Sequence, residues 1–284
     1  MIAEGLRRKV ARGGSKVLIY AAENHNRAKE MLRDAVVSEV PLAERDAVGA
    51  RVQFVNTVIS KMCGLVTDPE VIKAHDLTPM WPGVVPDRAL LVEDYDRLLI
   101  DHVALDGFQR GITTFEEKPD LLPFKEAKLF GHNGTHAMAA YLAGFRGATR
   151  MTELRAMDDL MRFLRAAFLN EAGTALIRKY GGFDPLFTCE GFTEFVDGVL
   201  ERMVNPHLLD TVRRVGRDPR RKLGWEDRLV GTLRLALEYG VDAPRYAFGT
   251  AAALATLEPA ILEAGSPVRD LLTAIWEAQA PDPD

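Results

Sequence analysis

Residues 128–144 read KLFGHNGTHAMAAYLAG, and this stretch is the most informative part of the chain. We expect a helix here. At about 100° per residue it places Asn133 about 140° and His136 about 80° around the axis from Lys128. An amine, an amide and an imidazole would then share one side, as in an acid/base cluster that polarises a carbonyl group. On spacing alone, a solvated helical face with a partly satisfied histidine is the favoured interpretation.

The helical pattern extends on both sides of this stretch, from about Asp120 to the end of the chain. Apolar residues between 157 and 168 recur at steps of three and four, which predicts one buried helical stripe that runs on to Gly181 and Gly182. The same pattern returns at 192–203, and further helices are predicted around 229–239 and 268–278. We therefore expect residues 119–284 to form a mostly α-helical domain.

Residues 1–118 have a different character, which predicts a mixed α/β part. The wholly apolar run at 17–20 suits a buried parallel strand, and a polar turn and a helix at about 27–37 follow it. The β-branched segment 51–62 predicts another strand. Segment 89–101 is ambiguous, and we favour strand for its Leu-Val and Leu-Leu-Ile pieces.

A nucleotide-binding fold normally opens with a strand, a GxGxxG turn and a helix, and no GxGxxG occurs in this sequence. The order strand, polar turn, helix over residues 17–37 is typical of the later part of such a fold. We therefore expect a partial Rossmann-like α/β part, the second half of a dinucleotide-binding domain, followed by the helical domain.

Composition excludes several classes of function. The formal net charge of -5 gives no global basic face for nucleic acid. Cys63 and Cys189, the two cysteines, cannot build a disulfide framework or, alone, a zinc site. No signal peptide and no apolar run of membrane-spanning length is evident, so we expect a cytoplasmic protein that binds neither nucleic acid nor membrane.

Several motifs, taken together, resemble one family. Lys-x4-Asn-x2-His followed by AYL at 128–142 is accompanied by AAEN at 21–24, NPHLLDTVRRVGRDPRRKL at 205–223 and DRLVGTLRLALEYG at 227–240. These stretches, in this order, are similar to the polyol-specific long-chain dehydrogenases, the mannitol dehydrogenase family. Its mannitol-1-phosphate 5-dehydrogenases are closest in character.

The resemblance implies a metal-free hydride transfer to NAD. Lys128 would be the general acid/base, which requires a pKa well below the free value of about 10.4. Asn24 and Asn133 would donate hydrogen bonds to the developing alkoxide, and Asn24 would also lie at the cofactor. His136 would hydrogen-bond the substrate hydroxyl or position Lys128. Without the resemblance, Asn24 is better explained as a turn or cap residue.

The basic segment 213–222 carries the argument about the substrate. By resemblance, Arg214 and Lys222 match substrate-contacting positions. Arg217 stands where free-polyol enzymes tend to have histidine, and a guanidinium grips phosphate by paired hydrogen bonds. The other arginines of the segment suit a solvated basic loop. Ser60 stands at a substrate-side position where the family usually has an aspartate, which removes a carboxylate acceptor for sugar hydroxyls and indicates a substrate other than mannitol 1-phosphate as an alternative.

The expected function is therefore oxidation of a hexitol phosphate, of the mannitol 1-phosphate to fructose 6-phosphate type, with NAD as cofactor. A hexuronate reductase or a free-polyol (mannitol 2-) dehydrogenase is the close alternative. A non-catalytic chain that binds a sugar phosphate and needs a separate nucleotide-binding partner is the other. Because the GxGxxG motif is absent, we expect this chain alone to bind NAD poorly and to need a separate or missing nucleotide-binding segment.

Overall fold

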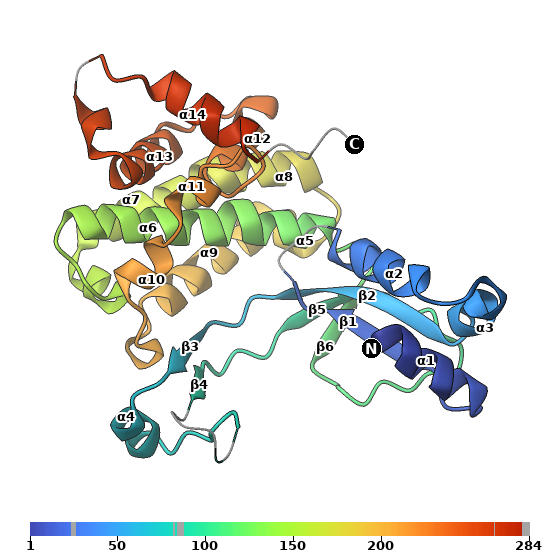
Figure 1. Ribbon diagram of the computed structural model, residues 1–284. Coiled ribbons are helices and arrows are strands. Elements are labelled where there is room, and N and C mark those ends of the chain that lie inside the picture. Colours follow the sequence, from blue (N-terminus) through green and yellow to red (C-terminus); the bar gives the residue numbers. More distant parts are fainter. Residues whose placement is uncertain (24–26, 82, 84–87, 264, 280–284) are drawn as a thin grey trace. The chain divides into compact units, whose positions relative to one another are not determined.

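The computed structural model describes residues 1–23, 27–81, 83, 88–263 and 265–279. The chain forms two compact units (Figure 1). The α/β unit consists of Met1–Lys61 and Asp94–Lys125, and the helical unit consists of Met62–Glu93 and Glu126–Asp284. The helical unit thus includes a segment from within the first 118 residues.

The α/β unit is built on a four-stranded mixed sheet in the order β1-β2-β5-β6. Its strands are β1 (Val17–Ala21), β2 (Val52–Ile59), β5 (Leu98–Asp101) and β6 (Phe115–Lys118). β1 and β2 are parallel, β5 runs antiparallel to β2, and β6 is parallel to β5. Only part of the sheet therefore has the parallel arrangement of a Rossmann-like fold.

The helices of this unit pack on the sheet through small and branched apolar side chains. They are α1 (Ile2–Ala11), α2 (Ala28–Ser38), η1 (Leu42–Glu44), α3 (Arg45–Gly49) and, at the boundary with the helical unit, α5 (Leu122–Glu126). Leu6 of α1, Val36 of α2 and Val48 of α3 form one buried cluster with Val52 of β2. β1, α2 and β2 make a βαβ unit, which confirms the predicted strand at 17–20 and the helix that follows it.

Segment 89–101 forms two strands, which confirms the strand prediction for its Leu-Val and Leu-Leu-Ile pieces. β4 (Ala89–Val92) pairs antiparallel with β3 (Cys63–Val66) in the helical unit, whereas β5 belongs to the four-stranded sheet. The polar residues between the two strands, EDYDR, separate two short apolar runs, and each run belongs to a different unit.

The helical unit contains most of the chain's helices. In chain order they are α4 (Pro69–Ala74), η2 (Ala127–Asn133), α6 (Gly134–Phe145), η3 (Met151–Ala156), α7 (Asp158–Ala166), η4 (Ala167–Gly173), α8 (Thr174–Tyr180), η5 (Pro185–Phe187), α9 (Cys189–Met203), η6 (Pro206–Leu208), α10 (Val212–Gly216), α11 (Pro219–Lys222), α12 (Val230–Glu238), α13 (Pro244–Leu257), η7 (Pro259–Leu262) and α14 (Val268–Glu277). The helical C-terminal region expected from the sequence is confirmed. Within the described residues, no helix is long and apolar enough to cross a membrane.

Two of the long helices contain a π-helical segment. Within the helical unit, η2 runs directly into α6 and η4 joins α7 to α8, so that each set forms one continuous rod. The two π segments pack against each other, with the ring of Phe168 in η4 against Gly131 in η2. The helix predicted at 128–144 is confirmed, but a rotation of 100° per residue does not hold over its first turns, because a π-helix bonds i to i+5.

Candidate active site

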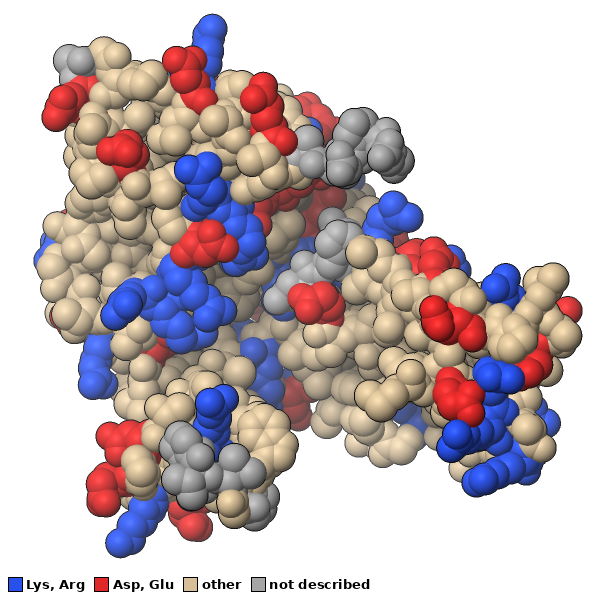
Figure 2. Space-filling view, viewed as in Figure 1, with Lys and Arg blue, Asp and Glu red and all other residues tan. Residues whose placement is uncertain are grey.

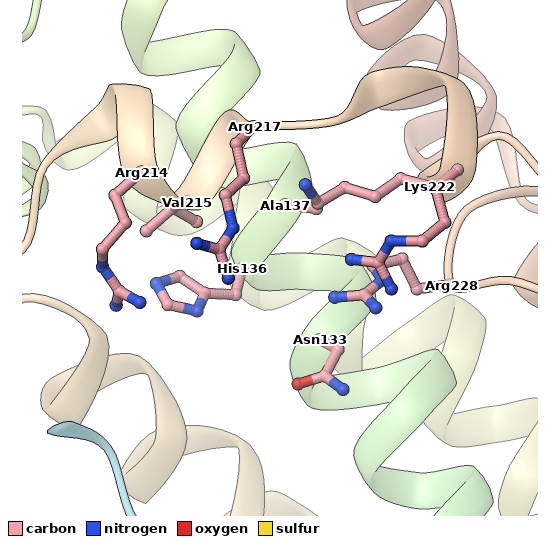
Figure 3. Close-up of a pocket in the computed structure, with 9 residues that line it drawn as sticks. Asn133, His136, Ala137, Arg214, Val215, Arg217, Lys222 and Arg228 are labelled. Atoms are coloured by element: carbon pink, nitrogen blue, oxygen red, sulfur yellow. The ribbon is translucent and has the colours of Figure 1, made fainter. Parts of the chain in front are cut away.

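A cavity of about 140 Å³ in the helical unit collects most of the predicted site residues (Figure 3). One wall comes from the end of η2 and the start of α6, and the other from α10, α11 and the residues before α12. Its lining consists of Asn133, His136, Ala137, Arg214, Val215, Arg217, Arg221, Lys222 and Arg228. The cavity therefore has one wall with an amide and an imidazole and another wall rich in cations.

Two short helices and the tight turn between them present the cations. Thr211 caps α10 by accepting a hydrogen bond from the backbone N–H of Arg214 at 3.2 Å. Asp218 caps α11 in the same way for Arg221 at 3.2 Å, and it adopts a left-handed backbone with φ of 56°. The chain reverses at Asp218, so that α10 and α11 place their basic side chains in one cavity.

Most of these cations are paired with carboxylates. Arg214 donates to both carboxylate oxygens of Asp210, with Nε at 2.6 Å from Oδ1. Arg228 Nε lies 2.7 Å from Oδ1 of Asp227. Arg221 pairs with Asp218 at 3.1 Å. Figure 2 shows Lys and Arg side chains gathered where α10 and α11 lie, with acidic groups among them.

Arg217 and Lys222 differ from the other cations in the cavity. Within the described part of the chain, neither side chain forms an ion pair. Figure 3 shows Arg217 extended toward His136 and Lys222 extended toward Ala137. Arg217 is exposed at its outer end, whereas Lys222 is buried with 3% of its surface exposed. These two side chains can therefore bind an anion without first breaking an ion pair.

Burial of the Lys222 side chain changes its pKa. It lowers the pKa of Lys222 to about 8, and the charges of Arg228 and Arg221 act in the same direction. The ammonium form consequently predominates at neutral pH but is lost under mildly alkaline conditions.

His136 is a neutral imidazole at physiological pH. Burial is the main cause that lowers its pKa to about 4; the charge of Asp210 opposes this shift and that of Arg214 adds to it. Its Nε2 atom is buried and has no hydrogen-bond partner among the described residues. A buried polar atom without a partner is costly, so a ligand hydroxyl in the cavity would satisfy it.

A second histidine, His132, lies one turn earlier. It is buried, its Nδ1 atom has no partner in the described structure, and its ring centroid is 6.1 Å from that of His136. Burial, together with the charges of His136, Arg202 and Lys128, lowers its pKa well below the usual value.

Lys128 and Asn133 both belong to η2. In an α-helix, residues five apart are separated by about 140° around the axis, and the wider turn of i to i+5 bonding reduces this angle. The π segment therefore brings the positions of Lys128 and Asn133 closer together around the rod than an α-helix would. Lys128 is half-buried and does not itself line the cavity.

The family is decided by the comparison with known domains. The family model described as the mannitol dehydrogenase C-terminal domain matches residues 120–272, which is more than half of the chain. The chain belongs to the mannitol dehydrogenase family. The match covers η2, α6, α10 and α11, the elements that build the cavity.

Solved structures with a similar fold include two dehydrogenases named for polyols. A D-sorbitol dehydrogenase in substrate-free form has a TM-score of 0.72 and 21% identity over 90% of this chain and 51% of its own. A Pseudomonas fluorescens mannitol 2-dehydrogenase, in a ternary complex with NAD and D-mannitol, has a TM-score of 0.66 and 19% identity, covering 90% of this chain and 50% of its own. This chain thus spans about half the length of these structures.

In this mannitol dehydrogenase family chain, the structure brings five predicted site residues into one cavity. They are Asn133, His136, Arg214, Arg217 and Lys222. Lys128 lies on the same rod, Asn24 falls outside the described residues, and Ser60 belongs to the α/β unit. The structure thus brings five of these residues together, and the catalytic and binding roles of all eight stay predictions.

Sequence reasoning assigned no site role to Arg228 or His132. Arg228 stands within a stretch that was recognised only for its general character, and nothing in the pattern showed that its side chain reaches the cavity. His132 follows Lys128 by four residues, the spacing of one helical turn, and this was the available signal.

Proposed function

We propose that this chain supplies the substrate-binding and catalytic part of an NAD-dependent dehydrogenase that oxidises a hexitol phosphate to a ketose phosphate. The observation that carries the proposal is the cavity itself. It places an amide and an imidazole with an unsatisfied nitrogen opposite Arg217 and Lys222, which form no ion pair among the described residues. Such a lining suits a ligand with hydroxyl groups at one end and an anion at the other.

Lys128, in this proposal, takes the proton from the hydroxyl at the reacting carbon. Asn133 donates a hydrogen bond to the same oxygen as negative charge develops on it, and neutral His136 hydrogen-bonds a substrate hydroxyl. NAD, when bound, supplies the hydride acceptor. In the reverse direction, protonated Lys128 returns the proton to the carbonyl oxygen.

The structure describes only some of the residues that we expect to bind NAD. The parallel unit β1, α2 and β2 is the building block of dinucleotide-binding folds, and Asn24, three residues after the end of β1 in the sequence, lies outside the described residues. The sequence has no GxGxxG turn. The proposal therefore includes a further nucleotide-binding segment, as additional sequence or as a partner chain.

The test is a panel of substrates assayed by NADH absorbance, with the nucleotide-binding segment supplied. The panel contains mannitol 1-phosphate, sorbitol 6-phosphate, free mannitol, free sorbitol and a hexuronate. Higher kcat/KM on the phosphorylated hexitols is expected. Turnover of free polyols or hexuronates alone would refute the phosphate assignment, and the absence of turnover on every member would refute the dehydrogenase proposal.

A free polyol is the second candidate. It is supported by the two structural relatives, whose names carry sorbitol and mannitol rather than their phosphates. Arg217 and Lys222 weigh against it, because a neutral ligand would leave two cations in the cavity without an anionic partner.

A further inference from the structure

The π segment η2 is held by side chains from two other helices. The backbone carbonyl of Phe130, in η2, accepts a hydrogen bond from Tyr246 Oη at 2.8 Å. Thr232 Oγ1 lies 3.1 Å from the same carbonyl and shares its proton with the carbonyl of Arg228, at 2.7 Å. Tyr246 belongs to α13 and Thr232 to α12. Tyr246 Oη also lies 2.9 Å from Thr135 Oγ1, in the first turn of α6.

These hydrogen bonds supply donors for a backbone carbonyl of the π segment. Where i to i+5 bonding gives way to i to i+4 bonding, one carbonyl is left without a backbone N–H. Phe130 lies in the middle of η2, which ends at Asn133, where α6 begins. The Tyr246 side chain is fully buried, and burial raises its pKa, so its hydroxyl keeps the proton that it donates.

The second π segment fixes Tyr246 in turn. Glu171, in η4, is buried and accepts hydrogen bonds from the backbone N–H of Tyr246 at 2.9 Å and of Arg245 at 3.0 Å. The ring of Phe168, also in η4, fills the space beside Gly131 so closely that an added Cβ would lie 2.3 Å from it. Tyr246 thus connects the two π segments, through its N–H on one side and its hydroxyl on the other.

We propose that Tyr246 is a positioning residue, whose hydroxyl holds η2 in its π-helical form and thereby keeps the positions of Lys128 and Asn133 closer together around the rod than an α-helix would. Reversion of η2 to α-helix would separate these two positions by about 140° around the axis. The role that we give to Tyr246 in catalysis rests on the proposed function. The hydrogen bonds by which Tyr246 holds η2 belong to this chain alone.

Hydrogen exchange measured by mass spectrometry on the whole chain tests the device directly. In Tyr246→Phe, the amides of residues 131–134 should exchange about tenfold faster, because a buried carbonyl loses its main donor. Thr232→Val should produce a smaller change in the same place. Tyr141→Phe is the matched control, since that buried hydroxyl has no hydrogen-bond partner among the described residues. Unchanged exchange in Tyr246→Phe, or an equal change in Tyr141→Phe, would overturn the inference.

A second readout follows Lys128 itself. Competitive labelling of amines across pH, followed by peptide mass spectrometry, gives the pH at which Lys128 is half reactive. The unsubstituted chain should give a value below the free lysine value of about 10.4, and Tyr246→Phe should move it toward that value while Lys222 stays unchanged. If the amides of residues 131–134 exchange faster in Tyr246→Phe but the pH of half reactivity of Lys128 does not shift, Tyr246 has a purely structural role and the inference is overturned. If Lys128 of the unsubstituted chain instead reacts with the half-reactive pH of free lysine, Lys128 is refuted as the base. The hydrogen-exchange result would then still show whether Tyr246 holds η2.

Discussion

Replacing Arg217 by histidine is the substitution that separates a phosphorylated substrate from a free polyol. Arg217 lines the cavity and forms no ion pair in the described structure, so its guanidinium is available to an incoming anion. Histidine is shorter, is mostly neutral near pH 7.5 and cannot form the paired hydrogen bonds of a guanidinium. Arg217→His should therefore weaken binding of mannitol 1-phosphate and leave binding of mannitol nearly unchanged.

The size of the effect follows from the exposure of Arg217. A hydrogen bond to a charged group contributes about 1.5–3 kcal/mol, and the lower value applies here because the side chain is exposed and the solvent screens it. About 1.4 kcal/mol corresponds to a factor of ten in Kd. The phosphate ligand should thus bind about tenfold more weakly to Arg217→His, and the difference should shrink as salt concentration rises.

Calorimetric titration of the chain with mannitol 1-phosphate and with mannitol measures both affinities. Arg213→His is the matched control, because Arg213 is a neighbouring exposed arginine that does not line the cavity. An equal loss of affinity for the two ligands would show that Arg217 does not recognise phosphate. An equal effect of Arg213→His would show that only the general positive charge of the segment matters.

Three further substitutions or conditions test other parts of the site. Lys128→Ala should lower kcat by several orders of magnitude with the substrate Kd little changed, and unchanged turnover would remove Lys128 as the acid/base. Affinity for mannitol 1-phosphate should fall as pH rises through about 8, where Lys222 loses its proton, and Lys222→Arg should abolish this fall; titrations at several pH values would show either result. Gly131→Ala should lower the free energy of unfolding by about 1–3 kcal/mol, because the added methyl group would overlap the Phe168 ring. Gly198→Ala, at an open position in α9, should instead raise the free energy of unfolding by about 0.5–1 kcal/mol. Chemical denaturation measures both values, and equal changes in the two variants would contradict the packing described for η2.

The helical half of the fold could be predicted because its signal is local. The apolar stripe at 157–168 and the paired glycines at 181–182 predict a helix and its end, and α7, η4 and α8 form one rod that ends at Tyr180. The π segments within the rods could not be predicted. They depend on long-range contacts, such as those of Tyr246 with Phe130 and of Phe168 with Gly131, which no local pattern reveals.

In the α/β unit, the sequence predicts individual strands and helices but not how the strands pair. The strand at 17–20 and the helix after it are evident from periodicity, but the direction of β5 relative to β2 is set by tertiary pairing. Segment 89–101 reads as one apolar stretch interrupted by EDYDR, and only the structure shows that its two ends belong to different sheets.

The site was predictable to the extent that its chemistry lies in short motifs. Asn133, His136, Arg214, Arg217 and Lys222 were identified from two stretches of sequence, and they line one cavity. Which cations remain available to a ligand could not be foreseen, because Asp210, Asp218 and Asp227 pair with only some of them.

The most direct test of the central claim is the formation of NADH from mannitol 1-phosphate, followed by absorbance, by this chain with its nucleotide-binding segment supplied and by the Lys128→Ala variant. The account predicts NADH formation that depends on the phosphate group and is lost in Lys128→Ala, although both proteins bind the sugar phosphate equally well in calorimetry. Equal rates of NADH formation by the two proteins, or no NADH from a protein that binds both ligands, would contradict it.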